Sequence, residues 1–300
     1  MLKIQNGAIS FDRLEVKFNI DDTGKPLGVY FKEQKESNKL IEEFMLLANK
    51  RVAEFIGKVA KGIKAKTFVY RIHDKPDPEK LERFSKFIQR FGYGINTSSQ
   101  KNITSSINDL LDQVQGKKEQ NVIETLAVRS MAKAVYSTKN VGHYGLSFSH
   151  YSHFTSPIRR YPDMMVHRLL TAYMDGEKSA NQNKYEDMCK HSSERERKAA
   201  EAERASIKYK QVEFMKDHIG EDFDGVISGV TEWGFYVELN DSKCEGLVHI
   251  RELDDDYYFF DEDNYSIIGR RNKKRINWEI CQNYIVRADL EKKPLDYPLA

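Results

Sequence analysis

Two neighbouring arginines follow a Ser-Pro pair near the middle of the chain, and together they could bind phosphate. Ser156 and Pro157 are typical of a helix start, because proline fits the first helical turn. The free N–H groups of such a start attract anions. The guanidinium groups of Arg159 and Arg160 can hold phosphate oxygens in pairs. The sequence therefore predicts a phosphate site at residues 156–160.

Residue chemistry alone leaves two other interpretations of this segment open. His143, His150 and His153 could ligate a metal, although their spacings of seven and three residues fit no standard zinc pattern. The arginines could instead pair with a nearby acid such as Asp163. The segment would then be a helix entry that binds no ligand.

Aromatic and basic residues near the C-terminus have spacings that suit the stacking of nucleic-acid bases. Trp233 and Tyr236 flank a Gly-Phe pair, and His249 and Arg251 follow further along the chain. Aromatic faces beside basic groups bind bases at roughly 1–3 kcal/mol per stack without reading their sequence. The alternative is that these rings form the core of a small barrel.

Two regions with different sequence patterns must position these residues. Residues 1–220 favour helices after an opening hairpin: apolar residues recur at helical spacing over Leu40–Val59, Asp77 is a helix cap, and a capping box predicts a long helix from Ser193. In the remainder, short β-branched and aromatic runs alternate with turn residues. We expect an α+β protein in which a mainly helical domain precedes a small β-barrel of the oligonucleotide-binding type over residues 221–300.

Composition excludes several classes of protein. Of the 300 residues 40% are hydrophobic, which argues against wholesale disorder, and no run approaches the roughly 20 apolar residues that span a membrane. Three widely spaced cysteines argue against a disulfide framework and indicate a reducing cytoplasm. A net charge of only +2 gives no global sign of a nucleic-acid partner. We expect a cytoplasmic globular protein without membrane attachment, and we infer no stable protein partner.

A highly specific resemblance is carried by residues 143–168, which read HYGLSFSHYSHFTSPIRRYPDMMVHR. They resemble the signature near the end of the RNB catalytic domain of the RNase II and RNase R exoribonucleases. LIEEFMLLANKRVAEF at 40–55 and YRIHDKP at 70–76 agree with the same domain in the same order. GVISGVTEWGFYVEL, followed by EGLVHI, resembles an S1 RNA-binding domain. The resemblance covers essentially the whole chain and implies an enzyme of the RNase R kind, which processively releases 5′-mononucleotides from the 3′ end of single-stranded RNA.

The resemblance also implies roles for single residues of the helical part. Arg159 would hold the scissile phosphate and stabilise the charge that builds on it. Arg160 is predicted to bind RNA from its chemistry as a phosphate ligand, and not from the resemblance. Phe11 would form one jaw of a clamp on the terminal bases, and Glu203 would support the end nucleotide. Without the resemblance, Phe11 would be read as core and Glu203 as a solvated helix charge.

In the S1 part, the family's RNA-facing positions are the two aromatics around the glycine and the histidine of the GLVHI strand. They correspond here to Trp233, Tyr236 and His249, with Arg251 nearby, whereas Phe235 is expected to point inward. A basic run at residues 270–275 is expected to form a loop between strands that could reach phosphates.

The resemblance implies Mg²⁺ for the complete enzyme, held by four aspartates spaced D-x5-D-x-D-D early in the RNB domain. No segment upstream of the barrel has this spacing. Asp255, Asp261, Asp263 and Asn264 nearly reproduce it, but they lie in the S1 part among large aromatics, where a solvated acidic loop is the better interpretation. We therefore expect no metal site in this chain and no nuclease activity from the chain alone.

Two functions from different classes remain. The first is the C-terminal part of an exoribonuclease, holding the phosphate arginine and the RNA grip. The second is a non-catalytic protein that binds single-stranded RNA in the same groove. A helical scaffold for protein partners is a more distant third.

Overall fold

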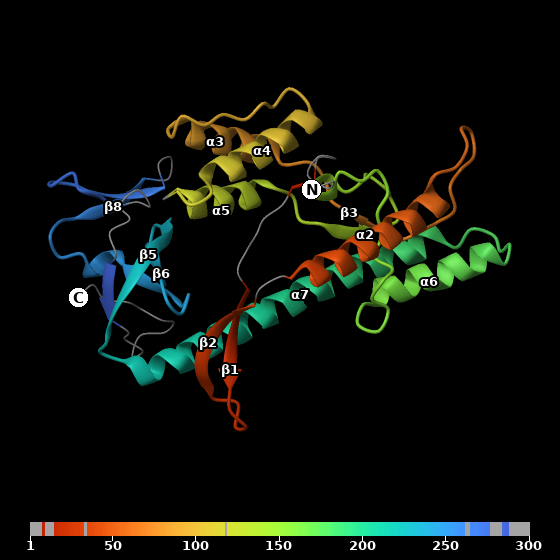
Figure 1. The fold of residues 1–300 in the computed structure, drawn as a ribbon. Helices are drawn as coiled ribbons and strands as arrows, with labels where there is room; N and C mark the ends of the chain where they lie inside the picture. Colours follow the sequence, from red (N-terminus) through yellow and green to blue (C-terminus); the bar gives the residue numbers. More distant parts are fainter. Residues whose placement is uncertain are drawn as a thin grey trace.

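The computed structural model describes residues 8–9, 15–32, 35–117, 119–261, 265–276 and 284–287. Phe11, the predicted base clamp, lies outside these residues. Within them the protein is α+β, as expected: helices dominate the first two thirds and short antiparallel strands the last third (Figure 1). No helix in these ranges is both long and apolar enough to cross a membrane.

The expected N-terminal hairpin is present. Strands β1 (Glu15–Ile20) and β2 (Pro26–Lys32) pair antiparallel. The carboxylate of Asp21 accepts hydrogen bonds from the N–H groups of Thr23 and Lys25, which fixes the turn. The hairpin packs against the last turns of the long helix α7, where the rings of Phe18 and Phe214 lie 6.2 Å apart.

A first hydrophobic core surrounds the predicted phosphate segment. Helix α2 (Glu36–Gly57), helix α6 (Tyr161–Met174) and the N-terminal half of α7 (Gln182–Met215) pack around the small sheet of β3 (Tyr70–Ile72) and β4 (Val135–Ser137). The core residues of this cluster include Ala53, Phe68, Val69, Met165, Val166 and Cys189. The loop between β4 and α6, which contains the short helix η1 (Tyr144–Leu146), runs across this core.

A second core joins helices α3 (Pro78–Gln89), α4 (Gln100–Val114) and α5 (Gln120–Ser130). Asp77 caps α3 as predicted, because its carboxylate accepts the N–H of Glu79 at 2.9 Å. Each helix buries one apolar face, which includes Phe84 of α3, Leu110 of α4 and Ile123 of α5.

Helix α7 connects the first core to the barrel, and its start corrects a sequence prediction. The helix begins at Gln182 with Asn181 as its cap, not at Ser193. The Ser193 hydroxyl donates to Cys189 O within the helix and accepts the N–H of Tyr136 from β4. At about 1.5 Å per residue, the 34 residues of α7 span about 50 Å.

The C-terminal part is a small antiparallel barrel reached through the short helix η2 (Lys216–His218). One sheet has the order β11 (Tyr284–Arg287), β5 (Asp222–Thr231), β6 (Gly234–Leu239), β7 (Glu245–His249). The other has the order β10 (Arg275–Ile276), β9 (Ser266–Gly269), β8 (Tyr258–Asp261), and the short helix η3 (Ile250–Glu252) lies between β7 and β8. Phe235 is fully buried, as predicted, among core residues that include Met215 from the end of α7.

Candidate RNA-binding groove and barrel surface

A groove of about 650 Å³ runs between the segment that follows Pro157 and one face of α7. The residues from outside α7 that line it are Tyr136, Arg159, Arg160, Tyr161 and Pro162. The α7 residues that line it are His191, Ser192, Arg195, Glu196, Ala199, Ala200 and Glu203. The groove therefore unites Arg159, Arg160 and Glu203, three of the residues predicted from the sequence.

Arg159 is exposed and reaches this groove from a turn, not from a helix start. The N–H groups of Arg159 and Arg160 both donate to Ser156 O, and helix α6 begins only at Tyr161. In the described residues no ion pair engages the Arg159 guanidinium. The side chain is therefore available to bind an anion in the groove.

The predicted helix start at Ser156 is wrong, and the reason is a buried carboxylate. Asp163, in the first turn of α6, is fully buried, and its Oδ1 accepts both the Ser156 N–H at 2.7 Å and a guanidinium N–H of Arg160 at 2.9 Å. The N–H that was expected to attract an anion is thus already bonded. Arg160 therefore forms the ion pair with Asp163 that was expected for a helix entry without a ligand. Its contact with RNA stays a prediction.

Charged and aromatic side chains support the floor of the groove. Arg71 of β3 forms an ion pair with Glu196 of α7 at 2.6 Å, and its guanidinium carbon lies 4.6 Å from the ring centre of Tyr136. The Tyr136 hydroxyl makes a 2.8 Å hydrogen bond with Nδ1 of His153. Burial is the main cause that raises the pKa of Tyr136, so its hydroxyl keeps its proton at neutral pH.

The three histidines considered as metal ligands do not meet at one point but make separate contacts. Nδ1 of His143 accepts the N–H of Leu146, His153 bonds Tyr136, and Nδ1 of His150 bonds the Ser149 hydroxyl. No group of three or more His, Cys, Asp or Glu side chains that could hold a metal occurs in the part of the chain that is described. The Mg²⁺ that the resemblance implies has no ligand set among the described residues.

Acidic pH is expected to destabilise the fold through these histidines. Burial is the main cause that lowers the pKa of His143 and of His153 to about 3. The next cause is the neighbouring His73 for His143 and the charge of Arg160 for His153. An unfolded histidine titrates near 6.5. Because the folded pKa is the lower one, stability is complete above pH 6.5 and falls as the pH drops toward 3.

Urea unfolding at pH 7.5 and pH 5.5 measures this effect. Each buried histidine should remove about 1.4 kcal/mol of unfolding free energy over that interval, whereas most carboxylates lose their contributions only at lower pH. In His153→Gln, the difference between the two pH values should shrink by about that amount, whatever the absolute stability of the variant. An unchanged pH difference would contradict the prediction.

Sequence reasoning missed His191, Arg195 and Tyr136 in the groove. A signal for two of them was present, because His191, Arg195 and Glu203 recur at multiples of four residues and so share one face of α7. Tyr136 could not be found in this way, since it reaches the groove from β4 through the pairing of β3 and β4.

The barrel carries a second surface, formed by the outer face of β5, β6 and β7. Inward and outward residues alternate along β6, so Phe235 and Val237 are buried while Tyr236 faces outward. Trp233, in the turn between β5 and β6, has 59% of its surface exposed. His249 faces outward opposite Gly234. We call this outer face the platform.

Two observations bear on the alternative that the aromatics are core. Trp233 is too exposed to be core, and Tyr236 lies on the face opposite to the buried Phe235. Arg251 is exposed in η3, directly after His249. The four predicted barrel residues therefore gather at one end of the platform, where the N–H of Ile250 also bonds Trp233 O.

Gly234 is required for the shape of this end of the platform. Its φ of +149° is one that side-chain-bearing residues rarely adopt, and a Cβ there would lie 2.0 Å from Val248 O. Any side chain at this position would push β7 away from β6. Gly234 thus lets β6 pair closely with β7, while the rings of Trp233 and Tyr236 on either side of it stay on the outside of the barrel.

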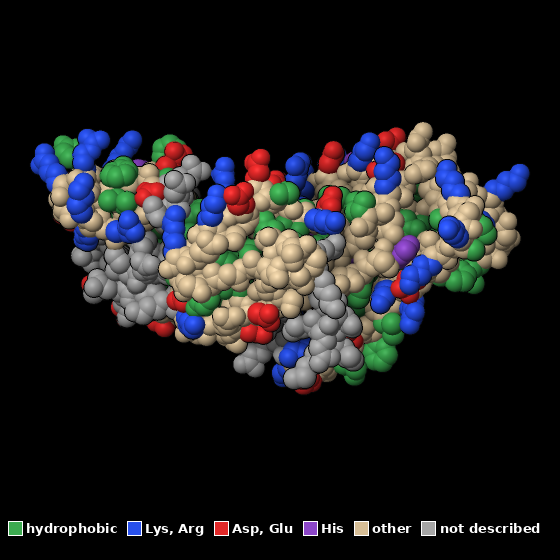
Figure 2. All heavy atoms as spheres, turned by 90° about the horizontal axis from the view of Figure 1, so that it is seen from above, with side chains coloured by type: hydrophobic (Ala, Val, Ile, Leu, Met, Phe, Trp, Pro, Cys, Tyr) green, Lys and Arg blue, Asp and Glu red, His purple; other side chains and the backbone are tan. Residues whose placement is uncertain are grey.

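Basic side chains are distributed unevenly over the surface. Figure 2 shows Lys and Arg gathered over the barrel end and over the opposite end, near α6. Residues 270–274 of the basic run form the predicted loop between β9 and β10, and Arg275 is the first residue of β10. Part of this loop is bound by the acidic segment: Asp256 accepts the N–H groups of Arg271 and Asn272, and Asp255 pairs with Lys274 at 3.4 Å.

Comparison with known proteins places this geometry in a family. The model of the RNB domain matches residues 2–176, and that of the S1 RNA-binding domain matches residues 216–277. Ribonuclease R 1 of Lactococcus lactis is 38% identical over 304 residues, which cover 99% of this chain and 36% of that protein. The chain thus spans well under half the length of the curated relatives it matches.

Solved structures share the fold. RNase R of Mycoplasma genitalium, solved with ribose-methylated single-stranded RNA, superposes with a TM-score of 0.86 at 23% identity, covering all of this chain and 47% of that one. Yeast Ssd1, described as a pseudonuclease, superposes with a TM-score of 0.60 at 25% identity over 78% of this chain and 29% of that one. Together with the matched RNB domain, which extends over more than half of the sequence, these findings show that the chain belongs to the RNB family of RNase R-type ribonucleases and carries an S1 domain.

Proposed function

We propose that this chain is the RNA-holding part of a 3′–5′ exoribonuclease of the RNase R type. The observation that carries the proposal is the groove in which Arg159, Arg160 and Glu203 meet, although up to 44 residues separate them in sequence. In this proposal the chain has two domains: the RNB part over residues 1–220 and the S1 barrel over residues 221–300.

Each part has a role that its chemistry supports. Arg159 binds the phosphate to be cleaved and, in the transition state, stabilises the negative charge that builds on its oxygens. Asp163 holds Arg160 and the backbone of Ser156, which keeps the turn that carries Arg159 in place. Glu203 accepts hydrogen bonds from the sugar of the end nucleotide. On the platform, Trp233, Tyr236 and His249 stack the bases of the incoming strand, and Arg251 binds its phosphates.

Binding of single-stranded RNA by the chain tests this function. Fluorescence anisotropy with a labelled 12-nucleotide RNA should give saturable binding that weakens as salt rises, because bound phosphates release their counterions. A duplex of the same length without a single-stranded end should bind more weakly. Failure to bind the single strand at low salt would overturn the proposal.

A second candidate is a non-catalytic RNA-binding protein, which the likeness to the pseudonuclease Ssd1 favours. Both candidates predict that the chain alone releases no nucleotides with Mg²⁺ or Mn²⁺ present, since no metal ligand group occurs among the described residues. Incubation with 3′-labelled RNA measures this. Stepwise release that Asp255→Asn or Asp261→Asn abolishes would show that the acidic segment of the barrel is a metal site after all.

A further inference from the structure

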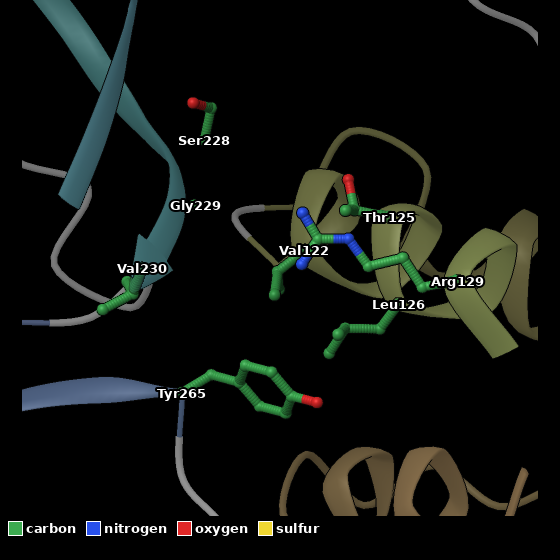
Figure 3. Close-up of a pocket in the computed structure, with 8 residues that line it drawn as sticks. All are labelled: Val122, Thr125, Leu126, Arg129, Ser228, Gly229, Val230 and Tyr265. Carbon is green, nitrogen blue, oxygen red and sulfur yellow. The ribbon is translucent and has the colours of Figure 1, made fainter. Parts of the chain in front are cut away.

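The platform of the barrel meets helix α5 along strand β5. In the described residues, strand β5 pairs with β11 over Asp222–Gly225. Further along β5, Ser228, Gly229 and Val230 line a cavity of about 30 Å³ together with residues of α5 (Figure 3). The helical part thus lies directly against one edge of the platform.

This contact is anchored by Tyr265, between β8 and β9. Its ring lies 5.4 Å from that of Phe87 in α3, edge to face, and it lines the cavity together with Leu126 of α5. Its φ of +44° is unusual for a residue with a large side chain. The packing of Tyr265 into the second core therefore fixes where α5 lies beside the barrel.

Arg129 is the cation that this arrangement brings to the platform. It is exposed in the last turn of α5, and Figure 3 shows its side chain extended toward β5. In the described residues it makes no ion pair, and it lines the cavity beside Gly229. Gly229 pairs with Tyr236, whose Cδ2 lies 3.8 Å from where a Cβ of Gly229 would be.

Two lysines lie near the strands of the platform. Lys243 pairs with Glu238 at 3.2 Å, and Lys208 donates to Glu245 O, so both lysines are already engaged. Arg251 serves the end of the platform at Trp233. A base that stacks on Tyr236 leaves the phosphate of the same nucleotide to be bound by a cation beside the platform.

We propose that Arg129 binds a phosphate of the nucleotide stacked on Tyr236, so that single-stranded RNA passes from the barrel onto α5. The proposal rests on the proposed function, because it extends the same RNA-binding surface. It assigns α5 a direct contact with RNA, in addition to its part in the second core. Position 229 carries no side chain next to the ring of Tyr236, and Arg129 lines the same cavity as this glycine.

Arg129 also favours helix α5 through the dipole at its C-terminal end. The test must therefore separate RNA contact from helix stability. Arg83, exposed on α3, offers a matched control, since Arg83→Gln removes the same charge from another helix of the same core.

Anisotropy titrations of Arg129→Gln and Arg83→Gln at four salt concentrations test the proposal. Arg129→Gln should raise the Kd for the 12-nucleotide RNA about three- to tenfold and lower the slope of log K against log salt by about 0.7, the value for one phosphate of a single strand. Arg83→Gln should change neither. Arg129→Lys, which keeps the charge, should recover most of the affinity.

A double-mutant cycle locates the contact. In a Tyr236→Ala background, Arg129→Gln should cost clearly less affinity than in the unaltered chain, because both residues hold the same nucleotide. Equal effects of Arg129→Gln and Arg83→Gln, or a lowered thermal midpoint with unchanged RNA affinity, would overturn this inference alone. An unaltered chain that binds no RNA would overturn the proposed function and the inference with it.

Discussion

A chain with Trp233→Ala and Tyr236→Ala is expected to bind single-stranded RNA at least about thirtyfold more weakly than the unaltered chain. Each lost stack costs roughly 1–3 kcal/mol, and a tenfold change in affinity corresponds to about 1.4 kcal/mol. The rings can be removed without opening the core, since Trp233 is 59% exposed and Tyr236 faces outward. Anisotropy with the same 12-nucleotide RNA measures the loss.

Two further variants interpret that result. Tyr257→Ala removes an aromatic that is 72% exposed and lies outside the platform, so its RNA affinity should stay unchanged. Phe235→Ala removes a fully buried ring and should lower the unfolding free energy by about 3–5 kcal/mol. If the double variant is folded and binds RNA as the unaltered chain does, the platform aromatics do not hold RNA.

The fold could be predicted from the sequence where local signals and tertiary packing agree. The hairpin, the Asp77 cap of α3 and the strands of the barrel rest on short-range chemistry: turn residues, a capping side chain, and alternating burial. The inward position of Phe235 was expected together with the S1 resemblance, and the ring is fully buried. Each of these predictions is confirmed.

Both failed helix starts involve a polar group whose partner is supplied from elsewhere in the fold or chain. At Ser156 the backbone N–H bonds Asp163, so the chain makes a turn before α6 begins. At Ser193 the hydroxyl serves Tyr136 of β4 and Cys189 O, and α7 continues upstream to Asn181. A capping motif in the sequence shows only which nearby groups can form a hydrogen bond. Where a partner from another element takes that hydrogen bond, the helix begins at a different residue.

The candidate site, too, could be predicted from the sequence only in part. Residue chemistry pointed to Arg159 as a phosphate ligand but not to its role at the scissile phosphate, which came from the resemblance, and Glu203 could be selected only by resemblance, because an exposed helical glutamate has no local signal of function. The groove that unites them depends on the contact of α7 with the segment after Pro157. Arg129 was not selected at all, since its relevance arises from packing between two parts of the chain.

The largest effect on turnover is expected from Arg159→Lys in a complete enzyme. Replacing the matched 36% of Lactococcus lactis Ribonuclease R 1 with this chain would provide such an enzyme for the test. Lysine keeps the positive charge but loses the paired N–H groups that fit phosphate oxygens. Because the charge on those oxygens grows toward the transition state, kcat should fall by about 10²–10³, whereas the Kd for RNA should change less than about threefold.

Arg168→Lys serves as the matched control, since Arg168 is exposed on α6 and does not line the groove. It should leave kcat and Kd unchanged in the same chimera. Single-turnover rates with 3′-labelled RNA separate the chemical step from binding and product release. If Arg159→Lys lowers affinity and rate by the same small factor, Arg159 is one phosphate contact among several, and the transition-state charge is stabilised elsewhere. A large loss confined to the rate would show that Arg159 stabilises the charge of the transition state. Asp163, which bonds Ser156 N–H and Arg160, would then keep the turn that carries Arg159 in place.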